Sequence, residues 1–150
     1  MADSERVLQG PLLPVVAGVV WMGEQLLVQR RGPGYGADML EFAGGKIEAG
    51  EQPRGALARE LCEEWGQAAE RLVIGRILEV TRHVYPEPGP DVLLLFFEVD
   101  APADDEWWRG LCPAEGASLV RLRPEALREG DFLAADRAVA AALREGAWRR

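Results

Sequence analysis

The distribution of apolar and polar positions along the chain predicts a sheet with two helices. Five segments rich in apolar and β-branched residues, bounded by turn-forming residues, have the pattern expected of strands. They are Val15–Trp21, Gln25–Arg30, Leu72–Val84, Val92–Val99 and Ala117–Leu122. The third is long enough for one or two strands, and the fourth is a nearly continuous apolar run, as expected for a strand buried on both faces.

Two other segments predict helices. Gln52–Trp65 contains strong helix formers and has Pro53 at its start, where the missing N–H costs little. Asp131–Glu145 is expected to be the closing helix. Residues typical of turns and irregular loops separate the elements, at Gly32–Asp38, Tyr85–Pro90 and Asp100–Pro113.

The first predicted helix has two unlike faces. Residues three and four positions apart share a face of a helix. One face should therefore carry Glu60, Glu63 and Glu64, and the opposite face Ala58, Leu61, Cys62 and Trp65. Like charges at these spacings cost roughly 0.2–0.5 kcal/mol per pair, which a bound divalent cation would offset. Oxygen ligands suit Mg²⁺ or Mn²⁺, although a glutamate-rich face is also what plain solvated surface shows.

The stretch from Gly45 to Gly66 has more fixed spacings than a solvated face requires. It resembles the Nudix box, which is a Gly, five residues, a Glu, seven residues, and then Arg-Glu-apolar-x-Glu-Glu-x-Gly-apolar. The matching residues are Gly45, Glu51, Arg59, Glu60, Leu61, Glu63, Glu64 and Gly66. Only Gln67 departs, because it is polar where an aliphatic residue is usual.

The resemblance extends outside the box and is closest to the MutT-like and CTP pyrophosphohydrolase-like branch. The strand ending in Gln29-Arg30 resembles that branch, and so does the segment 40–48, although Leu40 stands where a Trp is usual. This resemblance implies an α/β fold, a Nudix-type α/β/α sandwich with a mixed β-sheet. The single domain would span residues 11–146, with a flexible N-terminus at 1–10 and a tail at 147–150.

The resemblance also implies roles for individual residues. The metal ligands would be the Gly44 carbonyl, Glu60, Glu63, Glu64 and Glu115. Glu51 would hold Arg59, Arg59 would orient the catalytic glutamates, and Glu60 is the first choice for taking the proton from water. Glu115 could equally be a solvated loop residue.

Phosphate and base contacts follow from the same resemblance. Arg30 and Lys46 would bind phosphate oxygens, while Phe42 and Asp136 would line the base pocket. An ionised Asp136 can only accept hydrogen bonds, which favours an exocyclic amino group or a ring N–H. Tyr85 lies roughly where diadenosine polyphosphate hydrolases of the superfamily carry an aromatic residue for stacking, but we expect it to be a turn aromatic that packs on the sheet. Trp65 is expected in the core, and Trp107 and Trp108 could stack on bases.

These roles imply a divalent-metal-dependent nucleoside triphosphate pyrophosphohydrolase. It would convert a triphosphate and water into a monophosphate and pyrophosphate, in a MutT-like cleaning of the nucleotide pool, with cytosine nucleotides or oxidised dGTP as substrates. One alternative is a Nudix hydrolase of another nucleoside diphosphate derivative, such as ADP-ribose, a nucleotide sugar or a diadenosine polyphosphate. Another is a non-catalytic nucleotide-binding module.

Composition supports one soluble domain and excludes several other classes. A chain of 150 residues can bury about two-thirds of its unfolded surface, and the net charge of −8 argues against binding duplex nucleic acid. The apolar run from Pro11 to Trp21 is interrupted by Pro14 and is too short to span a bilayer. Two cysteines make no zinc framework, and Cys62 is expected to pack in the core. One His and two Ser leave little for a Ser-His-Asp triad. We expect a cytoplasmic monomer or homodimer with no membrane partner.

Overall fold

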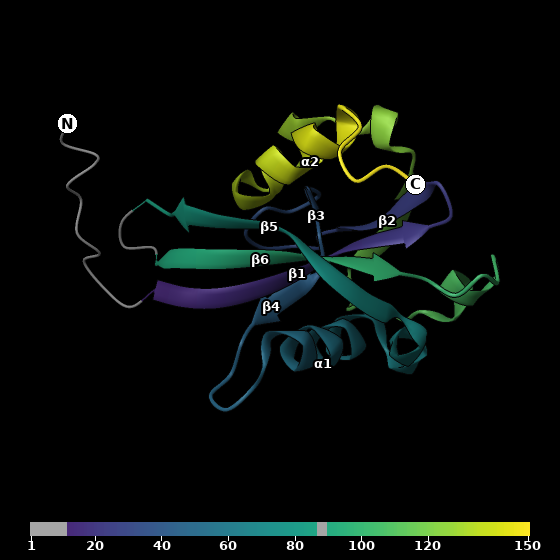
Figure 1. Ribbon diagram of the computed structural model, residues 1–150, viewed down its shortest axis with the longest axis horizontal. Helices are drawn as coiled ribbons and strands as arrows, with labels where there is room; N and C mark the ends of the chain where they lie inside the picture. The colour runs from purple at the N-terminus through teal and green to yellow at the C-terminus, as the bar shows by residue number, and fades with distance from the viewer. Residues whose placement is uncertain (1–11, 87–89) are drawn as a thin grey trace.

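The computed structural model describes residues 12–86 and 90–150, which form a mixed sheet between two helical layers. Figure 1 shows helix α1 (Pro53–Trp65) below the sheet and helix α2 (Arg137–Arg144) above it. The expected α/β/α sandwich is therefore confirmed. The expected flexible segment 1–10 lies outside the described residues.

The sheet has seven strands in the described part of the chain. They are β1 (Leu12–Met22), β2 (Gln25–Arg30), β3 (Leu40–Glu41), β4 (Gly44–Lys46), β5 (Val73–Val84), β6 (Asp91–Asp100) and β7 (Ser118–Leu122). Strands β1 and β6 pair in parallel, and the other pairs are antiparallel. The sheet is mixed, as expected.

Strand β1 shares one of its edges between two partners, and this arrangement creates the site. Val20–Met22 pair with β2, whereas Val15–Ala17 pair with β4. The chain enters β4 from β3, which pairs with the end of β2. The glycine pair of β4 is thereby held beside helix α1, while Leu40 of β3 pairs with the residues that precede α2.

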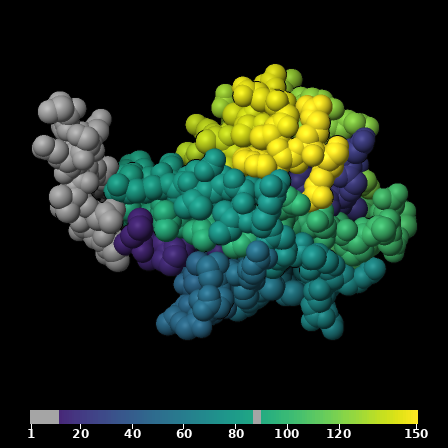
Figure 2. All heavy atoms as spheres, viewed as in Figure 1, coloured from purple at the N-terminus to yellow at the C-terminus, as the bar shows by residue number. Residues whose placement is uncertain are grey.

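Two apolar layers hold the helices on the sheet. Leu57, Leu61 and Trp65 of α1 pack with residues of β1 and β6 on one face, and α2 packs through Val139, Ala140 and Leu143 on the other. Strand β6 contributes to both layers, as the continuous apolar run predicts. In the space-filling view the C-terminal residues (yellow) and α1 (blue) lie on opposite sides of β5 (teal) (Figure 2).

Several boundaries differ from the expectation. Strand β1 runs through Pro14, whose carbonyl accepts the Ile47 N–H, so this proline does not interrupt it. The buried face of α1 includes Ala56 and Leu57, whereas Ala58 is exposed. The assignment of Ala58 to the apolar face was wrong, because that face is centred on Leu57, Leu61 and Trp65. Cys62 is only partly buried and packs at the margin of the core.

The closing helix begins later than expected, at Arg137. The residues before it bind to β3 instead of continuing the helix: the Leu133 N–H donates to the Leu40 carbonyl, and Phe132 forms a bridge with Leu40. The expected tail at 147–150 is also packed. Trp148 lies against the core, and Arg150 forms ion pairs with Glu98 and Asp100, each at 2.6 Å.

Candidate active site

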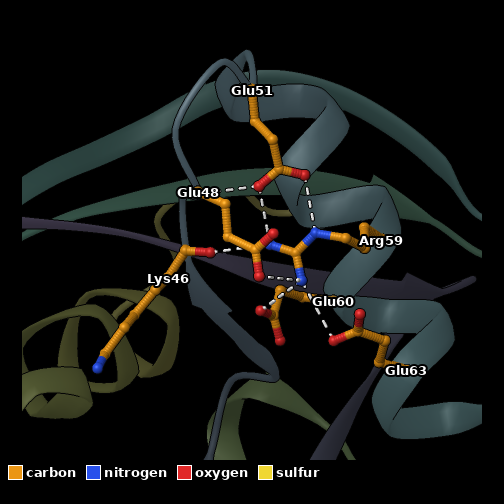
Figure 3. Close-up of polar contacts among 6 residues, drawn as sticks. All are labelled: Lys46, Glu48, Glu51, Arg59, Glu60 and Glu63. Atoms are coloured by element: carbon orange, nitrogen blue, oxygen red, sulfur yellow. Dashed lines mark hydrogen bonds and ion pairs between the residues drawn. The ribbon is translucent and has the colours of Figure 1, made fainter.

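Arg59 is the centre of an ion-pair network on helix α1 (Figure 3). Its Nε and Nη2 donate to the two oxygens of Glu51 at 2.7 and 2.8 Å, and Nη2 also donates to the Lys46 carbonyl at 3.0 Å. Its Nη1 donates to Glu60 at 2.9 Å and to Glu63 at 3.2 Å. The hydrogen bonds from Arg59, followed by the one from the Glu48 backbone, lower the pKa of Glu51 to about 2. Arg59 therefore joins the loop after β4 to the acidic face of the helix.

Glu60 lies against the glycine pair of β4. A Cβ added at Gly45 would overlap the Glu60 carboxylate, and one added at Gly44 would overlap the backbone of β1 at Val16. Glycine is therefore required at position 44, where the backbone of a neighbouring strand occupies the space of a side chain. At position 45 a side chain would instead displace the Glu60 carboxylate. This close approach places the Glu60 oxygens beside the peptide groups of β4.

Glu64 is the buried acid of the helix. Its Oε2 atom is buried and has no hydrogen-bond partner among the described residues. Burial, and then the charges of Glu41 and Glu60, raise its pKa to about 8. A buried carboxylate oxygen without a partner is costly, by about 1–3 kcal/mol or more, and a divalent cation is a partner that would satisfy it. The donors here are all oxygen atoms, so the residues fit Mg²⁺ or Mn²⁺.

The carboxylates are not gathered as the helix spacing predicted. No group of three or more Asp, Glu, His or Cys residues stands ready to hold a metal ion in residues 12–86 and 90–150. Glu63 is 59% exposed and points to Arg59, while Glu60 and Glu64 lie towards β4. Glu115 lies in an exposed loop, where Gly116 packs on Gly32 and Pro33. Among the described residues, Glu115 forms no hydrogen bond or ion pair with helix α1.

Two connected hollows open beside β4. The inner hollow, of about 170 Å³, is lined by Arg31, Glu41, Phe42, Gly44, Gly45 and Asp136, among others. The outer hollow, of about 670 Å³, is mostly apolar and includes Tyr35, Lys46 and Tyr85. Residues such as Val15, Arg31 and Leu133 line both, so together they form one elongated space with a polar inner end.

The inner end contains the predicted pair of base-pocket residues. The Phe42 N–H donates to Oδ2 of Asp136 at 3.0 Å, and the Phe42 ring stacks on Phe132 with ring centroids 5.1 Å apart. Asp136 is only 5% exposed. Burial raises its pKa to about 7, against the lowering effect of the Phe42 N–H. This carboxyl can therefore carry a proton near neutral pH, which the sequence-based argument for an ionised Asp136 did not include.

Arg31 lines both hollows, and the sequence analysis did not identify it. Its Nη1 donates to Glu41 at 2.7 Å and its Nε to the Tyr35 carbonyl at 3.0 Å. Arg30, the predicted phosphate ligand, is exposed, binds the Asp38 carbonyl and lines neither hollow. The period of two in a strand could have indicated this difference, since Leu27, Gln29 and Arg31 share a face that Arg30 does not. Lys46 does line the outer hollow.

The aromatic residues divide between the hollow and the core. Tyr85, expected to pack on the sheet, lines both hollows. Its ring makes an edge-to-face contact with the His83 ring, with the ring centroids 4.5 Å apart. Trp65 is fully buried, as expected. Trp107 and Trp108 belong to the core on the α1 side and line neither hollow, so the structure does not place them for base stacking.

Comparison with known proteins identifies the family. The NUDIX domain model matches residues 11–145, and the chain belongs to this family. An 8-oxo-dGTP diphosphatase of Escherichia coli K12 is 34% identical over 121 residues, covering 81% of this chain and 86% of that protein. A CTP pyrophosphohydrolase of the same organism is 40% identical over 79 residues, covering 46% and 58% of the two chains. The solution structure of the E. coli ORF135 protein covers 91% of this chain and 94% of its own, with TM-score 0.66 and 26% identity.

Family membership defines the class of chemistry. The protein is a hydrolase that acts on phosphoric anhydride bonds of a nucleotide substrate, and Nudix hydrolases generally use divalent metal ions. None of the described helices has the length and apolar content needed to cross a membrane.

Proposed function

We propose that this chain is a divalent-metal-dependent nucleoside triphosphate pyrophosphohydrolase that releases a nucleoside monophosphate and pyrophosphate. The elongated hollow carries the proposal, because it joins a polar inner end at Asp136 to an outer part lined by Arg31 and Lys46. Gly45 of β4 lines both parts and lies against the Glu60 carboxylate of α1. A nucleotide whose base lies at the inner end would direct its phosphates towards the side chains of Arg31 and Lys46. The names of the two E. coli relatives support a triphosphate substrate.

Residues of α1 and β4 would hold the metal. The Gly44 carbonyl, Glu60, Glu63 and Glu64 are the proposed ligands, with Glu115 as a further ligand if its loop moves inward. A bound Mg²⁺ or Mn²⁺ would neutralise phosphate oxygens and lower the pKa of a coordinated water. Arg59 orients Glu60 and Glu63, and the Glu60 carboxylate accepts the proton of the attacking water.

Arg31 replaces Arg30 as the first choice for a phosphate contact. Two of its donors are already used by Glu41 and Tyr35, which fix the guanidinium at the hollow. Its Nη2 group forms no hydrogen bond or ion pair with the described residues, so it is available to an anionic oxygen. Lys46 would bind a phosphate further out.

Asp136 and Phe42 would recognise the base. An ionised Asp136 accepts from an amino group, whereas a protonated one also donates through its O–H. The protonated form complements the amino group and ring nitrogen of cytosine, and the ionised form complements the ring N–H and amino group of guanine. Both cytosine nucleotides and oxidised dGTP therefore remain proposed substrates.

Turnover with a panel of nucleotides tests the proposal. CTP, dCTP, 5-methyl-dCTP, 8-oxo-dGTP, ADP-ribose and diadenosine tetraphosphate are incubated with Mg²⁺, and products are separated by chromatography. We expect monophosphate and pyrophosphate from at least one triphosphate, with a loss of about 100-fold or more in Glu64→Gln. Glu70→Gln, which changes an exposed acid near the same helix, should retain activity.

Two other results would contradict the proposal. Cleavage of ADP-ribose or the dinucleotide alone would assign the chain to another group of diphosphate substrates. Tight nucleotide binding with no turnover of any substrate would indicate a non-catalytic module.

A further inference from the structure

A buried side-chain hydrogen bond joins the end of helix α1 to strand β2. The Trp65 indole N–H donates to Oε1 of Gln29 at 2.8 Å. Trp65 is fully buried and Gln29 is only 7% exposed. A buried indole N–H requires an acceptor, so this contact fixes the relative position of the last helical turn and the strand.

The backbone around Trp65 is anchored as well. The Trp65 carbonyl accepts the Cys112 N–H at 2.6 Å. Gly66 ends the helix with φ of 86°, and its N–H donates to the Cys62 carbonyl. These contacts fix the main chain at the helix end, whereas the indole of Trp65 donates a hydrogen bond to β2, the strand that leads to the hollow.

The bond connects the two halves of the proposed site. Glu63 and Glu64 immediately precede Trp65, and Gln29 lies two residues before Arg31. Gln29 is also paired across the sheet with Glu41, the residue that binds Arg31. A shift of α1 along its axis would therefore move the acids relative to Arg31, and the bond opposes such a shift.

We propose that Gln29 and Trp65 are positioning residues that hold the Glu64 carboxylate where a divalent cation is bound. The inference rests on the proposed metal site of α1 and β4. Residues that orient metal ligands without touching the metal typically change affinity by about 10- to 100-fold when they are substituted. Here the contact acts through one helical turn, and the lower end of that range, about tenfold, is expected.

The test measures the affinity for Mn²⁺ alone, by electron paramagnetic resonance of the free ion. The variants are Trp65→Phe, which removes the donor, and Gln29→Leu, which removes the acceptor. Each should raise the dissociation constant about tenfold. The double variant should be no weaker in binding than either single variant, because all three lack the same bond. Its thermal midpoint should recover relative to Gln29→Leu, since no buried N–H is left without a partner.

A matched control separates positioning from general destabilisation. Trp107 is also buried and packs on the same side of the sheet. Its indole N–H donates at 2.8 Å to the carbonyl of Ala68, which follows helix α1 in the sequence, and not to strand β2. Trp107→Phe should lower the thermal midpoint and leave Mn²⁺ affinity unchanged.

Three outcomes with the variants would overturn the inference. They are unchanged Mn²⁺ affinity in folded Trp65→Phe, additive losses in the double variant, or an equal loss in Trp107→Phe. If the wild-type chain itself binds no Mn²⁺, the metal site fails and the inference fails with it. Binding by the wild type with no effect of the variants would instead leave the proposed function intact and refute only the positioning role.

Discussion

Arg59 binds both carboxylate oxygens of Glu51, with its Nε 2.7 Å from one and its Nη2 2.8 Å from the other. The remaining nitrogen, Nη1, faces Glu60 and Glu63. The guanidinium therefore links a residue on the loop after β4 to two acids of the helix, and its planar shape is needed to serve both sides at once.

Arg59→Lys should lower kcat by about 10- to 100-fold while the chain stays folded. A lysine keeps the charge, but it is a compact ammonium on a flexible stem that cannot form the paired contact. Steady-state kinetics on the best substrate of the panel, together with circular dichroism, would measure this. Activity equal to wild type would show that charge alone is enough. Arg54→Lys, on the same helix but outside the network, is the control.

Glu51→Gln should destabilise the chain at neutral pH but not in acid. The pKa of Glu51 is lowered to about 2 in the folded state, chiefly by its hydrogen bonds from Arg59, so the unfolded chain binds more protons between about pH 2 and the ordinary value of 4.5. Stability from this contact is therefore present above pH 4.5 and is lost as the pH falls towards 2. Urea unfolding of both proteins across this range should show the difference shrinking. A difference that stays constant would be incompatible with the lowered pKa.

Local spacing predicted the box, and long-range contacts explain what the sequence left out. The spacing within one helix predicts the acidic face of α1, and the apolar patterns predict the strands β1, β2 and β6. The spacing does not predict how the acids are divided, because Glu63 turns to Arg59 while Glu60 lies against Gly45 of β4. Asp136 and Phe42 are 94 positions apart, and their contact depends on the chain returning to β3 before α2 begins. Because Phe132 and Leu133 bind to Leu40 of β3, helix α2 begins only at Arg137. Local helix propensity does not contain this long-range contact.

Gly45→Ala should weaken Mn²⁺ binding and activity by at least about tenfold. The added methyl group would occupy the position of the Glu60 carboxylate, which would have to move away from β4. Gly55→Ala is the control, because it lies on α1 with nothing within 4 Å of the new methyl group. That change should stabilise the helix by about 0.8–1 kcal/mol. If Gly45→Ala binds Mn²⁺ normally, Glu60 is not confined to this position in solution.

Arg31→Gln should raise KM for the triphosphate about tenfold or more, whereas Arg30→Gln should leave it nearly unchanged. Of these two arginines, only Arg31 lines the hollows. Its loss would remove a hydrogen bond to a charged phosphate oxygen, which contributes about 1.5–3 kcal/mol. The two variants remove the same charge at adjacent positions, so long-range electrostatic effects are matched. A larger effect at Arg30 would reverse the assignment and restore the interpretation made from sequence alone.

Asp136→Asn should become more stable relative to wild type as the pH rises from about 4 to 7. Burial raises the pKa of Asp136 from 3.8 to about 7, so in this window the folded chain holds a proton that the unfolded chain has released. Wild-type stability therefore falls with rising pH and levels off above the folded pKa. The asparagine has no proton to lose and can still accept the Phe42 N–H through its Oδ1.

Urea unfolding without metal at pH 5 and pH 8 measures the Asp136 effect. The gain of the variant between these values should be at least about 1 kcal/mol, since one pKa unit corresponds to roughly 1.4 kcal/mol. Glu41 and Glu64 titrate in both proteins, so the comparison isolates position 136. A difference independent of pH would mean that the native carboxylate is ionised throughout. The inner hollow could then only accept hydrogen bonds from a base at that residue, and the protonated mode of cytosine recognition would be excluded.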